Sequence, residues 1–318
     1  MSFNILTAIH NILSSPIGEL RSFYTSRNRA NTMGEALENY VKDIFAGTLN
    51  ETNEQSRLVK LGQVFSYQGN QNNPPDIVIR GGDAIEVKKI ELPNAQLALN
   101  SSYPKAKVFA DSPMITSACR DCEEWTEKDI IYAVGVVNEN HLLKLFLVYG
   151  VDYAASAEIY ERIKSVIHEG VNTIPGVEFS STKELGRVNR VDPLGITYLR
   201  VRGMWGIENP SKVFSYVLPQ VPPCDFQVTA IIGSEKYSSF PAEDRHALES
   251  ISDELLQISE SQRSAAKERN TYSDAELKEL ALLTTPNFSI TDVKIKSPDN
   301  PSILKDAKVI TFFRRTEG

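Results

Sequence analysis

Two β-rich runs on either side of a glycine-rich turn, at residues 76–90, constrain the fold of this chain more than any other segment. Asp76 to Arg80 reads DIVIR, and Ala84 to Ile90 reads AIEVKKI. Between them stands Gly81 to Asp83, a composition typical of a three-residue hairpin loop. The sequence therefore predicts an antiparallel hairpin at this point.

The expected register of this hairpin sorts its side chains between two faces. A loop of this length pairs Val78 with Glu86 and Asp76 with Lys88. Because side chains alternate along a strand, Asp76, Glu86 and Lys88 share one face. The apolar side chains point the other way, into the core: Ile77, Ile79, Ile85 and Val87. Two carboxylates and an ammonium on one face are costly unless they bind something, and Mg²⁺ prefers oxygen ligands.

The charged face is a candidate site for metal-dependent hydrolysis of a phosphodiester. We assign Asp76 and Glu86 as metal ligands, with the carbonyl of Val87 as a possible third. Lys88 would orient the attacking water or help to deprotonate it, and would steady the phosphate. Lys89 alternates to the other face or to the strand edge and is a candidate for DNA contact. Pro75-Asp76 and Glu86-Val87-Lys88 together spell the PD…ExK signature of a large nuclease superfamily.

Residues 33–45 form an apolar stripe at helical spacing, preceded by Thr32 and Glu35 in a capping-box pattern and ended by Gly47. Glu38 flanks this stripe, so it could reach the edge of the sheet and assist the metal site. The alternative is a surface ion pair with Lys42, four residues further on.

The remaining elements are mixed, which predicts an α/β (α+β mixed) fold with a central mixed sheet flanked by helices. We expect helices at 5–13, 154–168, 242–258 and before 283, and strands at 130–137, 142–150, 196–202, near 214, 226–232, 288–296 and 308–313. The N-terminal helix could pack within the chain or supply contact surface to a second copy. We place a catalytic and DNA-recognition domain at 1–218 and a C-terminal α+β region at 219–318, which could equally be integrated with the same domain.

Composition and charge restrict the class of protein. With 41% hydrophobic and 24% charged residues, disordered and fibrous proteins are excluded. A net charge of −7 argues against a protein that coats nucleic acid without regard to sequence. The absence of a long apolar run or a signal-peptide pattern makes us expect a cytoplasmic protein with no membrane partner. Cys119 and Cys122 form a CxxC, but a zinc site needs two further ligands, so we interpret them as half-buried helix cysteines.

Arginines cluster in the segment before residue 205, in a chain that is otherwise acidic. The candidates for DNA contact here are Arg187, Asn189, Arg190, Arg200 and Arg202. The guanidinium fork matches the O6 and N7 acceptors of guanine in the major groove, so a GC-rich site calls for such side chains. The alternative is that these arginines form surface ion pairs with glutamates such as Glu184 and Glu208.

Four ordered segments resemble the NgoPII-type restriction endonucleases: NRANTMGEALENYVKDIF at 28–45, PPDIVIRGGDAIEVKKIE at 74–91, LALNSSYPK at 97–105 and KELGRVNRVDPLGITYLRVRGMWGIENP at 183–210. This resemblance implies a PD-(D/E)xK restriction-endonuclease-like core and Mg²⁺-dependent cleavage of double-stranded DNA. It also implies a homodimer, a GGCC-type target and a methyltransferase that acts on the same site without a required complex. Asp76, Glu86 and Lys88 match its catalytic motif, and Glu38 matches its helix glutamate. Asn100 and Ser101, in the third segment, are further candidates for DNA contact.

Two other functions remain open from the sequence. One is a different nuclease on the same catalytic core, such as a repair or junction-resolving nuclease. The other is a DNA-binding module without catalysis, which the complete set of three catalytic residues disfavours. The sequence therefore predicts a type II restriction endonuclease that cuts both strands at a short palindromic GC-rich site.

Overall fold

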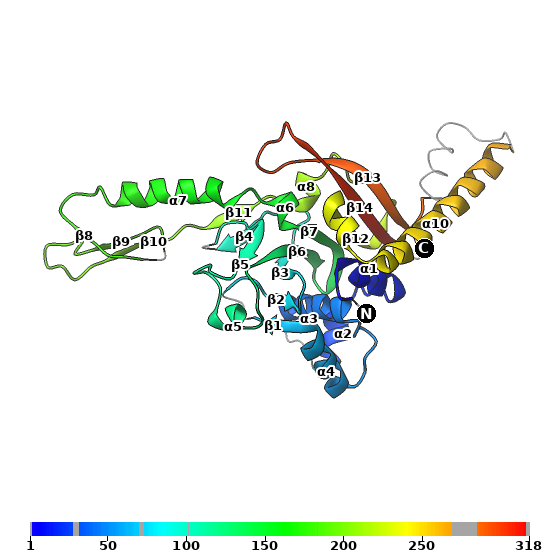
Figure 1. Cartoon of the computed structure of the whole chain (residues 1–318), viewed down its shortest axis with the longest axis horizontal. Helices are drawn as coiled ribbons and strands as arrows, with labels where there is room; N and C mark the ends of the chain where they lie inside the picture. Colours follow the sequence, from blue (N-terminus) through cyan, green and yellow to red (C-terminus); the bar gives the residue numbers. More distant parts are fainter. Residues whose placement is uncertain are drawn as a thin grey trace.

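A nine-stranded mixed sheet runs through the body of the computed structural model, which describes residues 2–27, 32–69, 73–100, 102–182, 184–268 and 285–315. The strand order is β1-β2-β3-β6-β7-β12-β14-β13, and β5 pairs with β6 outside this path. The strands are β1 Phe65–Gln68, β2 Ile77–Ile79, β3 Ala84–Ile90, β5 Lys107–Phe109, β6 Glu127–Asn138, β7 His141–Tyr149, β12 Cys224–Gly233, β13 Phe288–Lys296 and β14 Leu304–Arg315. Helices flank this sheet, so the predicted fold class is confirmed (Figure 1).

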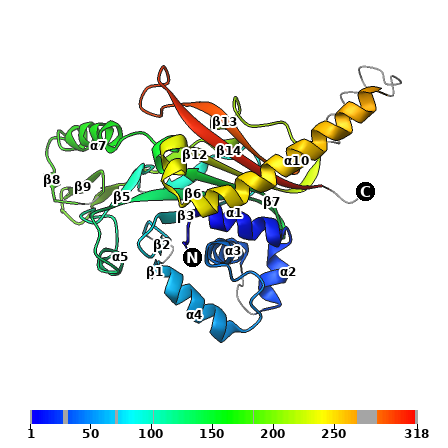
Figure 2. The ribbon, with the colours of Figure 1, turned by 45° about the vertical axis from the view of Figure 1, so that its right-hand side comes forward.

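Helices cover one face of the sheet (Figure 2). They are α1 Ile5–Ser14, α2 Leu20–Thr25, α3 Met33–Ala46, α4 Glu54–Val64, α9 Ser234–Ser239 and α10 Ala242–Glu268. The capping box of Thr32 and Glu35 forms as predicted at the start of α3, and Gly47 ends the helix with φ 65°. Ile5 and Ile9 of α1 are buried in this core. The N-terminal helix therefore packs within the chain, and the alternative of a contact with a second copy through these residues is wrong.

A second apolar core lies on the opposite face of the sheet. It is covered by short elements: α5 Ser117–Arg120, α6 Gly150–Tyr153, α8 Pro210–Val213, and the two-stranded sheet of β4 Leu97–Asn100 and β11 Trp205–Ile207. The strand predicted near Phe214 is wrong, because Asn209 caps α8 and Pro210 begins it, so Phe214 follows a helical turn and packs into this core.

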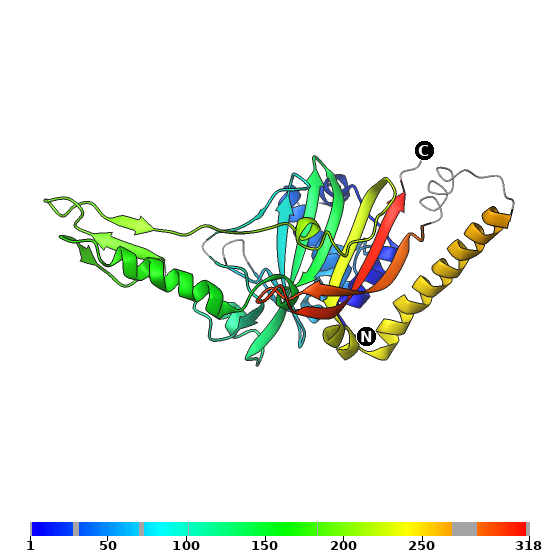
Figure 3. The ribbon, with the colours of Figure 1, turned by 90° about the horizontal axis from the view of Figure 1, so that it is seen from above.

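A long arm, residues 157–204, projects from the body (Figures 1 and 3). It consists of α7 Ala157–Val171 and a three-stranded sheet of β8 Glu178–Phe179, β9 Gly186–Asn189 and β10 Leu199–Val201. The helix begins later than the predicted residue 154, and β10 is shorter than the predicted strand at 196–202. β11 then returns the chain to the body by pairing with β4.

The C-terminal strands belong to the same sheet as the hairpin. β12 pairs in parallel with β7, and β14 pairs antiparallel with both β12 and β13. The predicted boundary at residue 218 therefore lies between elements that contribute to one sheet, and the division into two domains stays a prediction. The helix predicted at 242–258 continues to Glu268, so the start of the polar run predicted after it is helical. The rest of that run and the helix predicted before 283 lie outside the described residues. Among the helices of the described ranges, none is long and apolar enough to cross a membrane.

Candidate active site

The hairpin of β2 and β3 forms with a register that differs from the prediction. Val78 pairs with Ala84, and Ile77 pairs with Ile85, so β3 is shifted by two residues relative to the expected pairing of Val78 with Glu86. The turn closes one residue earlier than predicted, because the Ile79 amide donates to the Asp83 carbonyl at 2.9 Å and the Gly82 amide donates to the Ile79 carbonyl at 2.9 Å. The Asp83 side chain points away from the turn and accepts hydrogen bonds from Tyr149 Oη at 2.6 Å and Lys236 Nζ at 2.7 Å. A shift by an even number keeps each side chain on its predicted face.

The shift changes which charged residues face each other. Asp76 comes directly before β2, and its amide donates to the carbonyl of Ile85 at 3.1 Å, which places Asp76 beside Glu86 and not beside Lys88. Asp76 Oδ2 accepts from the amide of Val87 at 2.7 Å. Lys88 Nζ lies 2.6 Å from Glu86 Oε1. The three predicted catalytic side chains therefore form one cluster.

One carboxylate oxygen of this cluster lacks a partner. Glu86 Oε2 is buried and accepts no hydrogen bond from the residues that the structure describes. An unsatisfied buried carboxylate oxygen costs more free energy than an unsatisfied neutral group. The cluster is therefore a site where a cation or a hydrogen-bond donor would be stabilised.

Charge repulsion and burial perturb the protonation of the cluster. Burial first, and then the negative charge of Glu86, raise the pKa of Asp76 to about 7, although Lys88 and the Val87 amide act in the opposite direction. Burial acts to lower the pKa of Lys88, but the charge and hydrogen bond of Glu86 outweigh it and raise this pKa above its ordinary value. The free protein therefore holds Lys88 as an ammonium and resists ionisation of the Asp76 carboxyl.

Two other predicted residues lie at the margin of the cluster. Glu38 forms the ion pair with Lys42 that the sequence offered as the alternative, at 2.7 Å. Its charge is nevertheless one of the causes that raise the pKa of Asp76. The amide and the carbonyl of a strand residue point to the same side of the strand. Because the Val87 amide donates to Asp76 Oδ2, and β2 does not extend far enough to pair with Val87, the Val87 carbonyl also faces the cluster. Lys89 lies apart from the cluster and pairs with Glu91 at 2.9 Å.

The predicted recognition residues lie on the arm. Arg200 and Arg202 are exposed and both bond to Glu184, through Arg200 Nε at 2.9 Å and Arg202 Nε at 2.5 Å. Arg190 pairs with Glu178 at 3.1 Å, and Arg187 Nε donates to Asn189 Oδ1 at 3.3 Å. The free protein thus contains surface ion pairs between arginines and glutamates, which was the alternative to DNA contact. Because Arg200 and Arg202 both bond to Glu184, they lie on one side of the arm.

The other two candidates for DNA contact are less informative. Asn100 is the last residue of β4 and pairs with Trp205 of β11, at the base of the arm. Ser101 lies outside the described residues.

The sequence interpretation missed Lys105, which lies near the catalytic cluster. Burial is the largest cause and lowers the pKa of Lys105, against the negative charges of Glu161 and, next, of Glu86. Tyr132, which pairs with Glu86 between β3 and β6, bonds to the backbone of Lys105. The only signal in the sequence was the position of Lys105 at the end of the segment LALNSSYPK.

Comparison with known proteins agrees with the resemblance found in the sequence. The model of the NgoPII restriction endonuclease family matches residues 3–263. The type II restriction enzyme NgoPII of Neisseria gonorrhoeae is 48% identical over 310 residues, which cover 97% of this chain and 99% of that protein. No solved structure matches the chain. The predicted resemblance is confirmed, and the chain belongs to the NgoPII family of type II restriction endonucleases.

Proposed function

We propose that this enzyme hydrolyses one phosphodiester bond in each strand of duplex DNA, at a short palindromic GC-rich site of the GGCC type. The observation that carries the proposal is the cluster in which the Asp76 carboxyl lies beside Glu86 and Lys88 lies 2.6 Å from Glu86 Oε1. The enzyme would act in the cytoplasm, and a separate methyltransferase would protect the same site in the host genome without a required complex with this chain.

The cluster fits Mg²⁺ by the chemistry of its donors. Asp76 and Glu86 supply carboxylate oxygens, the Val87 carbonyl faces the same space, and Glu86 Oε2 is buried without a partner among the described residues. A bound cation would also remove the repulsion that raises the pKa of Asp76. When bound, the ion supplies Lewis-acid stabilisation of the phosphoryl oxygens and lowers the pKa of a water.

Lys88 has a narrower role than the sequence suggested. Because its pKa is raised by Glu86, the side chain is a charged donor at neutral pH and does not accept a proton. Its ammonium can orient the attacking water and hold a phosphate oxygen, while Glu86 fixes its position. Glu38, whose charge already acts on Asp76, would assist the cluster after release from Lys42.

A homodimer follows from the two-fold symmetry of a palindromic duplex, since each strand then meets one active site. The arm supports this assembly. An apolar stripe of Ile159, Ile163 and Ile167 lies exposed on α7, and near the tip of the arm Leu194 and Ile196 are 79% and 77% exposed. Apolar surface of this extent marks a protein contact, and a second copy of the chain would cover it.

Digestion of a sequenced plasmid with Mg²⁺, followed by mapping of the ends, tests the proposal. Wild-type protein should give discrete fragments with cuts at one sequence. Asp76→Ala, Glu86→Ala and Lys88→Ala should each abolish cleavage while the protein still binds its site. Lys60→Ala, which changes an exposed lysine of α4 that pairs with Glu51, is the matched control for catalysis. Random degradation, or undiminished cleavage by the three variants, would contradict the proposal.

A further inference from the structure

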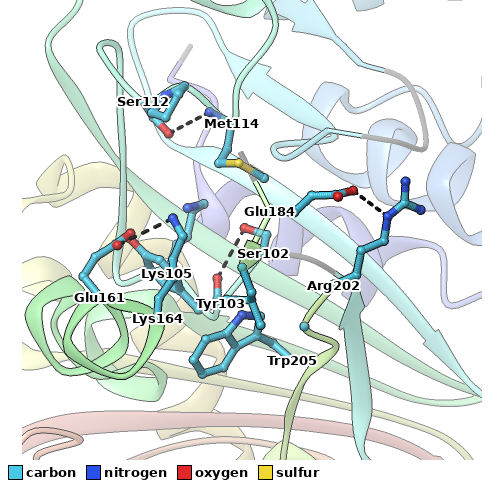
Figure 4. Close-up of a pocket in the computed structure, with 13 residues that line it drawn as sticks. Ser102, Tyr103, Lys105, Ser112, Met114, Glu161, Lys164, Glu184, Arg202 and Trp205 are labelled. Carbon is cyan, nitrogen blue, oxygen red and sulfur yellow. Dashed lines mark hydrogen bonds and ion pairs between the residues drawn. The ribbon is translucent and has the colours of Figure 1, made fainter. Parts of the chain in front are cut away.

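A small cavity lies where the arm joins the body (Figure 4). Its walls include Tyr103 and Lys105 from the body, Lys164 and Arg202 from the arm, and Trp205 from β11. Its volume is about 70 Å³. A single water needs about 10–15 Å³ by a comparable measure, so the cavity accepts a group of several heavy atoms.

Lys105 is held firmly at this cavity, and its ammonium makes no direct ion pair there. Its backbone amide donates to Tyr132 Oη at 2.7 Å, and its carbonyl accepts from the same hydroxyl at 3.2 Å. Its Nζ lies 4.6 Å from the centroid of the Tyr103 ring. Within the part of the chain that the structure describes, this ammonium forms no direct ion pair: the negative charge of Glu161 acts on it from a distance, and Glu161 itself contacts Lys164. A partly buried cation without a carboxylate in direct contact favours an anionic ligand.

The arm contributes a second cation to the same place. Figure 4 draws the ends of Lys105 and Lys164 side by side, next to Glu161. Lys164 Nζ lies 3.6 Å from Glu161 Oε2, a long contact for an ion pair. Among the described residues that line the cavity, Lys105, Lys164 and Arg202 carry positive charge, and Glu161 and Glu184 carry negative charge. The lining therefore has an excess of positive charge.

The position of the cavity relates it to the catalytic cluster. Tyr132, which holds the backbone of Lys105, pairs with Glu86 across neighbouring strands of the sheet. Strands in a sheet lie about 4.8 Å apart, so the cavity is a short distance from the catalytic carboxylates. A duplex that presents one phosphate to Glu86 would present another phosphate of its backbone near Lys105.

We propose that this cavity binds a DNA backbone phosphate close to the scissile bond, with Lys105 and Lys164 as its two cationic ligands. The inference rests on the proposed function, because it takes DNA as the substrate. Since one lysine comes from the body and the other from the arm, a single phosphate would fix the direction of the arm relative to the active site. Lysine suits this role because its ammonium acts as a point charge toward phosphate.

Binding to a fluorescent duplex tests the site, with the sequence taken from the mapped plasmid cut and with metal omitted. We expect Lys105→Gln and Lys164→Gln each to weaken binding about tenfold. Each should also reduce the slope of log K against log salt by about one, between about 50 and 200 mM. Glu161→Gln, which removes a negative charge from the same cavity, should strengthen binding. Lys60→Gln on α4, where Lys60 pairs with Glu51, should change neither quantity.

Neutral methylphosphonates, placed one at a time along each strand, locate the phosphate. At one position near the cut, the substitution should weaken binding by wild-type protein but cause no further loss with Lys105→Gln. Thermal melting checks that each variant is folded, and Lys164→Gln changes only the arm.

The possible failures can be told apart. Two results would overturn the phosphate site even if the plasmid is cut. One is an unchanged salt slope in both lysine variants. The other is that each methylphosphonate weakens binding by Lys105→Gln as much as it weakens binding by wild-type protein. If no plasmid is cut, the proposed function fails, and the salt slopes on a random duplex still decide whether the two lysines bind phosphate.

Discussion

Replacing the Asp76 carboxyl should make the metal-free protein more stable, and the gain should grow with pH. The pKa of Asp76 is raised from 3.8 to about 7 in the folded state. The folded protein thus binds this proton more tightly than the unfolded chain, so stability falls as pH rises from about 4 through 7. A difference of about three pKa units corresponds to ~4 kcal/mol lost at pH 8, of which less than half is lost at pH 5.

Asp76→Asn removes this loss and keeps an oxygen that can accept from the Val87 amide. In EDTA, the melting temperature of the variant relative to wild type should therefore be higher at pH 8 than at pH 5, by about 5 °C. Mg²⁺ should raise the melting temperature of wild type at pH 8 and leave that of the variant nearly unchanged.

Asp152→Asn provides a matched control for this experiment. Asp152 is a buried carboxyl that accepts from the Gly233 amide at 2.9 Å and pairs with Lys305 at 3.0 Å, so its loss should destabilise the protein at both pH values. If Asp76→Asn changes the melting temperature equally at pH 5 and pH 8, the argument from charge repulsion in the cluster is refuted.

Three further predictions concern the arm and the core. Arg200→Ala or Arg202→Ala should cost about 1–3 kcal/mol in binding to the cognate duplex and much less on random DNA, in a competition assay; equal losses would make these arginines contacts to the backbone. Arg57→Ala should lower the free energy of unfolding in urea by about 3–5 kcal/mol, because it removes the cation that pairs with the buried Asp43 carboxylate at 2.7 Å, while the Tyr24 hydroxyl still donates to that carboxylate. Ile163→Glu on α7 should shift the sedimentation coefficient toward that of a monomer, and an unchanged dimer would place the contact between copies elsewhere.

The sequence predicted correctly the ends of elements that are fixed by residues close by in the chain. The start of α3 was predicted because Thr32 and Glu35 bond to each other's backbone within a single turn. The faces of the hairpin were predicted because alternation does not depend on the pairing partner. Its register was wrong because a glycine-rich turn does not fix which two residues close it, and the closing pair is Ile79 with Asp83. Asp83 also bonds to Tyr149 and Lys236, residues that are distant in sequence and that no local pattern relates to the turn.

The arm could not be predicted from its own pattern. Ile159, Ile163 and Ile167 have the spacing of a helix that packs on a core, yet all three are exposed on α7. The spacing of apolar residues shows that one face of a helix is apolar. It does not show whether that face packs against the same chain or against another one. The sequence likewise showed that the arginines form a group. It did not show that they lie on a projecting arm, and it gave no sign that Lys105 lies near them.

The contacts between the two ends of the chain have a consequence for the speed of folding. Asn4 Nδ2 donates to Asp244 Oδ2 at 2.8 Å across a separation of 240 residues, and Arg314 Nη1 donates to the Pro16 carbonyl across 298 residues. Closing such long loops costs conformational entropy before the contacts repay it, so a chain with this contact order folds slowly. Until β12 and β14 join the sheet, the edge of β7 and the apolar side of α1 stay exposed to solvent and to other chains. A fragment that ends before β12 should therefore aggregate and should not yield a smaller working nuclease.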